Sequence, residues 1–417
     1  MSELSYLEKL LDGAEVEWLP LSSLCNLITT GKLNANAMED NGAYPFFTCN
    51  EEPYRINTYA FDLEAILISG NGSQVGHLNY YNGKFNAYQR TYILGGFNEN
   101  VDIMYLYYYL MHTLKPYIHK NSRKGSVPYI TMPMLENFKF PIPCPNNLEK
   151  SLAIQSEIVR ILDKFTALTA ELTAELNMRK KQYNYYRDQL LSFDEEQEKP
   201  IYLEKLLDGV EVEWKTLEDI SIKISSGGTP KTGVSEFYDG DIPWLRTQEV
   251  NFCDIWDTEV KITESGVKNS SAKWIPKNCV IVAMYGATVG KIGINKIPMT
   301  TNQACANIQL NEEVAHYRYV FHFLCSQYTY IKSLGTGSQT NINAQIVKNI
   351  KIPIPCPDNP KKSLAIQSEI VRILDKFDTL TNSITEGLPR EIELRQKQYE
   401  YYRDLLFSFP KPETVSN

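Results

Sequence analysis

The sequence lacks the residue patterns that hold metals and disulfides. Its eight cysteines are scattered along 417 residues, and none belongs to a C-x-x-C pair. This spacing argues against a zinc site and a disulfide framework, and it favours reduced thiols in a cytoplasm. No apolar run approaches the length that crosses a bilayer, and the acidic, amphipathic N-terminus is unlike a secretory signal. We expect a cytoplasmic protein with no bound metal and no membrane contact.

Convincing catalytic signatures are also missing. GATVGKIG at 286–293 superficially resembles a phosphate loop, but its spacing fails the G-x-x-x-x-G-K-[ST] rule, so a tight turn between strands is expected. SGNGSQVG at 69–76 only approximates G-x-G-x-x-G, and a polar strand pair follows it. The five histidines form no H-E-x-x-H motif. The sequence therefore predicts no catalytic residues and no cofactor in this chain.

What the sequence does have is a long internal repeat. SLAIQSEIVRILDKF occurs unchanged at 151–165 and 363–377. A PIPCP motif precedes each copy, and a Q-Y-x-Y-Y-R-D run follows each, within 179–193 and 395–409. The openers YLEKLLDGAEVEW and YLEKLLDGVEVEW differ at one position. The period of about 200 residues is far longer than that of a solenoid repeat, so the chain is one protein written twice.

The inserts between the matched pieces, 19–137 and 215–349, keep an order of elements but little sequence. Each has short β-rich runs broken by Gly and Asn, then an aromatic helix-like segment, then a Gly/Ser/Thr loop, so we expect one shared fold. The net charge of −8 comes mainly from the matched frame, and the inserts are nearly balanced. A neutral domain can still bind DNA if its basic residues gather on one face.

After each PIPCP motif, apolar residues spaced by three and four predict a long helix with a coiled-coil seam. Each helix of about 45 residues would be about 68 Å long if straight. In the second copy, Gly387-Leu388-Pro389 predicts a kink or an interruption. Matching seams predict that the two helices pair with each other. The predicted seam consists of Ile154, Ile158, Ile161, Phe165, Leu168, Leu172, Ile366, Ile370, Ile373, Phe377, Leu380 and Ile384.

Polar and aromatic loop residues of the inserts are the candidate DNA contacts. Arg, Asn and Gln can bond twice to a guanine or adenine edge, and Lys, Ser and Thr fit phosphates. Each residue alone also fits an ordinary solvated loop, so the prediction rests on the group. In the first insert the candidates are Asn71, Ser73, Gln74, Gln89, Arg90, Lys120, Arg123, Lys124 and Tyr129. In the second they are Thr229, Lys231, Arg246, Gln248, Thr288, Lys291, Asn302, Gln303, Gln339, Thr340 and Asn341.

Three features together resemble the specificity subunit of a type I restriction–modification enzyme: the duplicated frame, the PIPCP junctions followed by Q-S-E-I-V-R-I-L-D, and the run GGTPKT…IPWLRTQEV at 227–250. The resemblance covers essentially the whole chain. It implies an α+β fold of two pseudo-repeated β-rich target-recognition domains, joined by two long helices that pair as an antiparallel coiled coil. The first insert departs from the pattern at TTGKLN (29–34) and NGAYPFFTCNEEPY (41–54), which is compatible with a different subtype of recognition domain and makes the transfer of base contacts between the copies unsafe from sequence alone.

The resemblance also implies a function. Each recognition domain would read one half of a split site on double-stranded DNA. The helices would act as a ruler and dock two modification (methyltransferase) subunits, which bind S-adenosylmethionine and methylate adenine. Restriction subunits would add cleavage that uses ATP and Mg²⁺. This chain would itself be non-catalytic. A coiled-coil scaffold that binds proteins, and a nuclease or methyltransferase acting alone, are the alternatives.

The expected organisation follows the repeat. The predicted parts are a first recognition domain at 1–147, a first spacer helix at 148–193, a linker at 194–201, a second recognition domain at 202–359, a second spacer helix at 360–410 and a disordered tail at 411–417.

Overall fold

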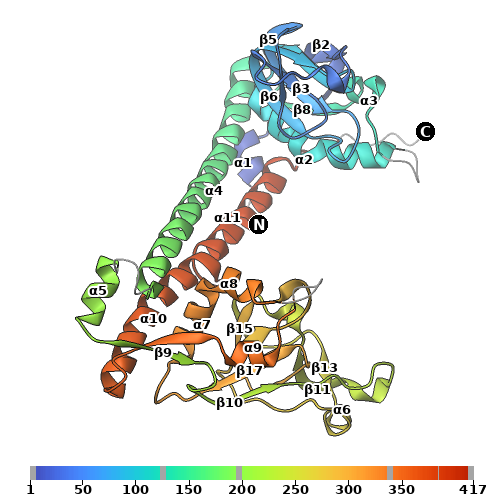
Figure 1. The fold of residues 1–417 in the computed structure, drawn as a ribbon. Coiled ribbons are helices and arrows are strands. Elements are labelled where there is room, and N and C mark those ends of the chain that lie inside the picture. The colour runs from blue at the N-terminus through green and yellow to red at the C-terminus, as the bar shows by residue number, and fades with distance from the viewer. Residues whose placement is uncertain (1–5, 123–127, 194–199, 336–340, 384, 412–417) are drawn as a thin grey trace. The chain divides into compact units, whose positions relative to one another are not determined.

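The computed structural model describes residues 6–122, 128–193, 200–335, 341–383 and 385–411. The chain forms two compact units (Figure 1). Unit 1 comprises Met1–Leu172 and Glu391–Asn417, and unit 2 comprises Thr173–Arg390. Both crossing points lie inside helices, so each unit contains one insert, the first part of its own frame helix and the last part of the other copy's helix.

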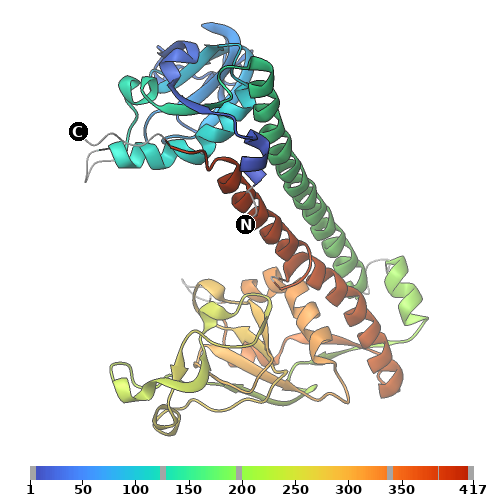
Figure 2. The ribbon, with the colours of Figure 1, turned by 180° about the vertical axis from the view of Figure 1, so that it is seen from behind.

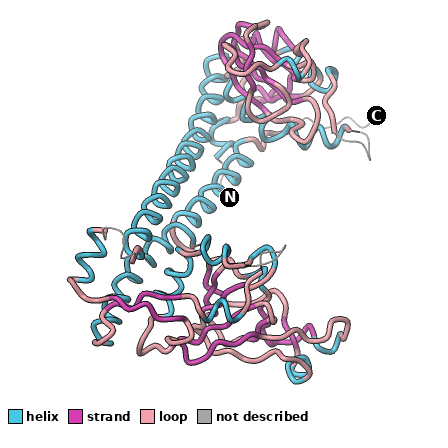
Figure 3. Tube along the Cα trace, in the orientation of Figure 1, coloured by secondary structure: helices cyan, strands magenta, loops and turns pink. Residues whose placement is uncertain are grey.

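Unit 1 contains a six-stranded sheet in the order β2-β7-β5-β6-β3-β4. Figure 3 draws the strands of both units in magenta and the helices in cyan. The central strand β5 alternates in the way a strand covered on both faces should: Ile66 and Ile68 pack into the core with the insert's helix, while Ala65 and Leu67 pack into a second cluster on the other face. The strands are β2 (Cys25–Thr30), β3 (Tyr44–Phe47), β4 (Tyr54–Ile56), β5 (Phe61–Ser69), β6 (Leu78–Ala87) and β7 (Thr91–Phe97).

The insert of unit 2 divides its strands between two sheets. Five form the order β10-β17-β14-β15-β12, and three form the order β13-β11-β16. The strands are β10 (Ser221–Ser226), β11 (Tyr238–Leu245), β12 (Cys253–Ile255), β13 (Lys261–Ile262), β14 (Val280–Ala283), β15 (Ile292–Asn295), β16 (Thr300–Thr301) and β17 (Cys305–Leu310).

The two inserts nevertheless use one set of strand pairings. The antiparallel pairs β2–β7, β5–β7 and β5–β6 correspond to β10–β17, β14–β17 and β14–β15. The parallel pair β3–β6 corresponds to β11–β16. The long strand β6 is replaced by two short strands, β15 and β16, and β12 is added beside β15. The expected common plan is therefore observed, with the sheet split in unit 2.

The matched frame strands bring the two ends of each insert together. The opener strand β1 (Val16–Pro20) pairs with β8 (Lys139–Pro143), and β9 (Val212–Thr216) pairs with β18 (Lys351–Pro355), both antiparallel. Because the second strand of each pair runs into the PIPCP motif at the end of the insert, both ends of each insert are held side by side. The short helices of the two units are α1 (Tyr6–Leu11), α3 (Met132–Glu136), α5 (Ile201–Leu207), α6 (Glu264–Lys268), α8 (Tyr328–Ser333) and α9 (Ala344–Lys348).

The aromatic segments form helices α2 (Ile103–Asn121) and α7 (Tyr317–Ser326). Each begins at a side-chain cap, Asp102 in α2 and His316 in α7. One fully buried tyrosine in each helix donates its hydroxyl to the frame strand, Tyr105 to the Pro141 carbonyl at 3.1 Å and Tyr319 to the Pro353 carbonyl at 2.7 Å. The aromatic pattern of both segments thus belongs to the core.

The long helices are α4 (Leu148–Leu191), α10 (Pro360–Asn382) and α11 (Leu388–Leu406). Within unit 1, α4 lies beside α11 (Figures 1 and 2), and Phe165 stacks on Tyr402 with ring centroids 5.3 Å apart. Within unit 2, Phe377 stacks on Tyr186 of α4, also at 5.3 Å. Each phenylalanine belongs to the unchanged repeat and each tyrosine to the terminal run of the other copy. The predicted antiparallel pairing is confirmed within each unit.

Burial along the seam is uneven. Ile154, Ile158, Ile366 and Ile370 are buried, whereas Leu168 is 37 % exposed. The matched pair Leu162 and Leu374 is fully buried although the pattern omitted it, because each frame helix also packs on its own insert. The remaining seam residues Ile161, Phe165, Leu172, Ile373, Phe377 and Leu380 are half-buried. Ile384 lies outside the described residues.

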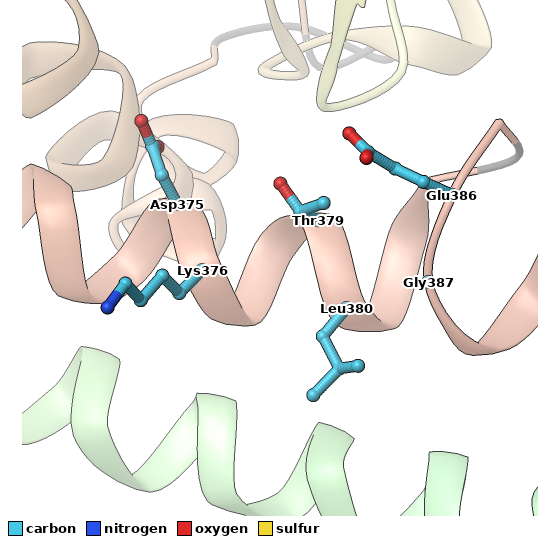
Figure 4. A pocket seen from close by; sticks show the side chains of 6 residues that line it. All are labelled: Asp375, Lys376, Thr379, Leu380, Glu386 and Gly387. Atoms are coloured by element: carbon cyan, nitrogen blue, oxygen red, sulfur yellow. The ribbon is translucent and has the colours of Figure 1, made fainter.

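The predicted interruption of the second helix is confirmed. Helix α10 ends at Asn382 and α11 begins at Leu388. Gly387 has a φ of +83°, and a Cβ there would lie 2.4 Å from the Thr379 carbonyl oxygen, so only glycine fits. A shallow pocket of about 450 Å³ lies at this break, with Asp375 and Thr379 on one side of α10 and Leu380 on the other (Figure 4).

No helix in the described part of the chain has both the length and the apolarity to cross a membrane.

Candidate nucleic-acid interface

In unit 1, several candidate residues lie on the loops that follow strands β2, β3, β5 and β6, and these loops are hydrogen-bonded to one another. We call this set of loops the loop edge of the unit. The Gly70 N–H donates to the Arg90 carbonyl at 2.9 Å, and the Gly70 carbonyl accepts from Ile130 N–H at 2.9 Å. The Gln89 N–H donates to the Leu33 carbonyl at 2.9 Å. These bonds bring Asn71, Arg90 and Tyr129 onto neighbouring loops, although they are far apart in the sequence.

Unit 2 builds the equivalent edge where β10, β11, β14 and β16 end. The Met284 N–H donates to the Ala304 carbonyl at 2.8 Å, and the Met284 carbonyl accepts from Ile342 N–H at 3.0 Å. The Thr229 hydroxyl donates to the Gln303 side-chain oxygen. Met284 therefore takes the place of Gly70, and Ile342 takes the place of Ile130.

The two glycine loops that superficially resemble phosphate loops share one conformation. In unit 1, Gly76 N–H donates to the Ser69 carbonyl at 2.8 Å and His77 N–H to the Gln74 carbonyl at 2.9 Å. In unit 2, Gly290 N–H donates to Ala283 at 2.8 Å and Lys291 N–H to Thr288 at 2.9 Å. The first glycines, Gly72 and Gly286, have φ of +82° and +81°. The tight turn expected at 286–293 is observed, and SGNGSQVGH (69–77) takes the same conformation as AMYGATVGK (283–291).

A close backbone approach fixes the neighbouring loop in both units. A Cβ on Gly31 would lie 2.0 Å from the Ala87 carbonyl oxygen, and one on Gly227 would lie 1.9 Å from the Thr301 carbonyl oxygen. Ala87 and Thr301 occupy matching places in the parallel pairs β3–β6 and β11–β16. TTGKLN and GGTPKT therefore take equivalent positions in the fold although their sequences differ.

Some candidates are already bonded within their unit. The Gln74 amide donates to Glu51 at 3.0 Å, and Lys291 Nζ donates to Asn251 Oδ1 at 2.8 Å. The Thr288 hydroxyl donates to the Thr247 carbonyl, so it ties two loops together. The Asn302 side chain accepts from Ala304 N–H at 3.1 Å, and its role is to stabilise the turn.

Arg246 lies between two carboxylates at the unit 2 edge. It is paired with Glu259 at 2.8 Å and with Glu249 at 3.6 Å, and its side chain is 26 % exposed. These two carboxylates balance its charge within the unit and orient its guanidinium.

The other candidates differ in exposure. Ser73, Gln89, Arg90, Thr229, Lys231, Gln248 and Gln303 are exposed, Asn71 and Asn341 are half-buried, and Lys120 is exposed in the last turn of α2. Arg123, Lys124, Gln339 and Thr340 lie outside the described residues. Lys32, Asn34 and Asn50 are also exposed on these loops of unit 1 and are not among the predicted residues. Their signal was the polar stretch TTGKLN…TCNEE, which marks the departure from the second copy.

The frame holds both inserts through matched glutamines. Gln155, fully buried in α4, accepts from Asp102 N–H at 2.8 Å and donates to the Asn100 carbonyl at 2.9 Å. Gln367 in α10 accepts from His316 N–H at 2.8 Å and donates to the Val314 carbonyl at 3.0 Å. Because both side chains bond only backbone groups of the insert, the contact does not depend on the insert's side chains.

A second frame position contacts side chains, and there the units differ. Asp163 accepts from the Tyr108 hydroxyl at 2.5 Å. The matching Asp375 accepts from Arg318 at 2.8 Å and lies 2.7 Å from Nε2 of the fully buried His322. Burial raises the pKa of Asp375, but His322 and the Arg318 guanidinium outweigh it, so the pKa lies below its usual 3.8. Arg318 also pairs with Asp254 at 2.9 Å.

The described residues hold no group of three or more histidine, cysteine, aspartate or glutamate side chains that could bind a metal ion. Burial raises the pKa of Cys25, Cys279 and Cys305 to about 12, so these thiols are protonated at neutral pH and unsuited to act as nucleophiles. The chemistry that the loop edges offer is hydrogen bonding, by side chains on loops that the strands hold in place.

Comparison with known proteins places the chain in a class. The family model described as the type I restriction modification DNA specificity domain matches it twice, over residues 14–179 and 209–394. The chain is 43% identical over 436 residues to the EcoR124I/EcoR124II type I restriction enzyme specificity subunit of Escherichia coli, covering 100% of both chains. It is 33% identical over 418 residues to the Escherichia coli EcoprrI specificity subunit, covering 93% of each.

Two solved structures share the fold. One is the S subunit of a type I restriction–modification system from M. genitalium, with a TM-score of 0.60 at 18% identity, covering 96% of this chain and 98% of that one. The other comes from work on complex assembly and conformational transition of the type I system, with a TM-score of 0.56 at 14% identity, covering 94% and 97%. The chain belongs to the family of type I restriction–modification specificity subunits, which are non-catalytic members of these systems.

Proposed function

We propose that this chain reads a bipartite site on double-stranded DNA through residues 1–147 and 202–359, each domain taking one half-site. The observation that carries the proposal is that the two units have equivalent loop edges. Two loop clusters follow one hydrogen-bond plan on one duplicated frame, yet they present different side chains. Such an arrangement suits one kind of task performed on two different sequences.

The loops suit a division of labour between bases and phosphates. Exposed amides such as Gln89 and Gln303 have the donor and acceptor pair that base edges require, and Lys231 and Arg90 fit phosphates. The other candidates of the two inserts, including Arg123, Lys124, Gln339 and Thr340, stay part of this proposal. Together they would form the DNA-binding residues of the two domains.

The partners follow from the duplication. Two equivalent surfaces of the frame would accept two modification subunits. They are marked by exposed tyrosines at matching positions of the two copies, Tyr6 with Tyr202 and Tyr185 with Tyr401. In this proposal S-adenosylmethionine is bound by those subunits, and ATP and Mg²⁺ serve restriction subunits. All eight cysteines are free thiols, which fits a reducing cytoplasm.

The long helices, 148–193 and 360–410, would set the spacing between the half-sites, with 194–201 as a linker and 411–417 as a tail. Adding about one heptad to both paired segments should lengthen the tolerated spacer and leave the half-sites unchanged. Variants that switch half-site sequence instead would contradict the ruler.

The binding test uses the chain complexed with its modification subunit. Its affinity for a duplex should depend on sequence and should fall steeply as salt rises, because phosphate contacts release counterions. The alternative, a coiled-coil scaffold that binds proteins, predicts neither dependence. The purified chain given Mg²⁺ or S-adenosylmethionine without other subunits should leave DNA unmodified.

A further inference from the structure

One turn at the loop edge carries the same residue in both units, although the surrounding sequences differ. In unit 1 the turn after β6 runs Tyr88-Gln89-Arg90-Thr91. In unit 2 the turn after β16 runs Asn302-Gln303-Ala304-Cys305. Gln89 lies as far along the chain after Gly72 as Gln303 lies after Gly286, and the backbone hydrogen bonds establish that the two turns correspond in the fold.

Three backbone bonds establish it. The first residue of each turn donates to the end of the parallel neighbouring strand, Tyr88 N–H to the Phe47 carbonyl at 2.9 Å and Asn302 N–H to the Leu245 carbonyl at 2.9 Å. The fourth residue donates back to the first, at 2.8 Å in unit 1 and 3.3 Å in unit 2. The third accepts from the glycine loop, through Gly70 N–H in unit 1 and Met284 N–H in unit 2. Gln89 and Gln303 are therefore the same position of one fold.

Both glutamines are exposed, and both are tied to the loop that follows the close-approach glycine. Gln89 is bonded through its backbone N–H to Leu33, two residues after Gly31. Gln303 is bonded through its side-chain oxygen to Thr229, two residues after Gly227. Among the described residues, the side-chain amide of Gln89 and the amide nitrogen of Gln303 have no hydrogen-bond partner. A primary amide held at the tip of such a turn presents a donor and an acceptor side by side, and the Gln303 oxygen keeps a second lone pair beside the one that accepts from Thr229.

That chemistry favours one ligand. A glutamine amide matches the N6 donor and N7 acceptor of adenine in the major groove, whereas it carries no charge for a phosphate. We propose that Gln89 and Gln303 are equivalent base-reading residues, each specifying an adenine in the half-site of its own domain. The inference rests on the proposed function and adds the position, the base and the equivalence of the two contacts.

The test measures discrimination at each base pair of the site. The chain, complexed with its modification subunit, is titrated with duplexes that differ by one base pair. Gln89→Ala should reduce discrimination at one A·T pair of one half-site by about 5- to 150-fold. Gln303→Ala should do the same in the other half-site. Each variant should leave the opposite half-site unaffected.

Matched controls lie inside strands of the same sheets and not on the loops. Asn82 is exposed in β6 and pairs opposite Glu64, and Gln309 is half-buried in β17 and pairs opposite Lys223. Asn82→Ala and Gln309→Ala should keep the wild-type discrimination. Thermal unfolding of all four variants, compared with wild type, establishes that each is folded.

The outcomes separate the two levels of the proposal. A wild-type complex with no sequence preference would overturn the proposed function and this inference with it. A wild-type preference that both glutamine variants retain would overturn this inference alone. A uniform loss of affinity for every duplex would also overturn it, because that is the signature of a phosphate contact.

Discussion

Unit 1 and unit 2 hold their inserts at the same two frame positions with different chemistry. Gln155 and Gln367 make the same pair of backbone bonds in both units. Asp163 meets only a neutral tyrosine, whereas Asp375 meets Arg318 and a buried histidine. The comparison shows how one frame tolerates two diverged inserts: one of its contacts needs only backbone, and the other is met by whichever donor the insert supplies.

The largest difference between the units should appear when Arg318 is replaced. Arg318→Met leaves Asp254, Asp375 and Asp378 close together without their cation, and it should cost about 3 kcal/mol of unfolding free energy in unit 2. Hydrogen exchange resolved by peptide gives the protection of each unit separately. Met104 is the matching residue of α2, and Met104→Leu should change protection of unit 1 by less than about 1 kcal/mol. Equal losses in both units would contradict this contrast.

The buried glutamines Gln155 and Gln367 should instead contribute equally to the stability of their units. Gln155→Ala and Gln367→Ala each strip the insert's N–H and carbonyl groups of a buried partner, which should cost about 2 kcal/mol in the unit concerned. The same peptide-resolved exchange measures it, and the untouched unit serves as the internal control. A clear loss of protection in one variant and none in the other would contradict the equivalence of the two glutamines.

Acid should separate the units again, by a smaller amount. The pKa of Asp375 is below its usual 3.8, so the aspartate stabilises unit 2 above that pH, and this contribution is lost as pH falls through the lower, folded-state pKa. Since Asp375 is one-third exposed, the effect should be smaller than the two above. Exchange measured below pH 4 should show a greater loss in wild-type unit 2 than in Asp375→Asn. Identical acid profiles for the two proteins would contradict the assignment.

The frame could be predicted from sequence because it is local and repeated. The unchanged repeat, the apolar spacing and Gly387-Leu388-Pro389 determine helices, their pairing and the interruption without any long-range information. The omission of Leu162 and Leu374 has a physical cause. A pattern for helix pairing counts one buried face, and these helices bury a second face against their inserts.

The loop edge could be predicted only in part. Residue chemistry selected Gln89, Gln303 and polar residues of the glycine loops, but the hydrogen bonds that hold these loops to Leu33, Thr229, Ile130 and Ile342 are long-range contacts that the sequence does not show. The Arg318 network was missed because its carboxylates come from residues 57 and 64 positions away. Such a group of charges has no sequence pattern of its own.

The central claim is that two domains of one chain each read their own half-site. Mapping methylated adenines across a genome, with this chain co-expressed with its modification subunit, tests it most directly. We expect one motif composed of two different short sequences separated by a fixed number of unread bases, with its first half altered in Gln89→Ala and its second half in Gln303→Ala, or the reverse. A single uninterrupted motif, or methylation without any motif, would contradict the account.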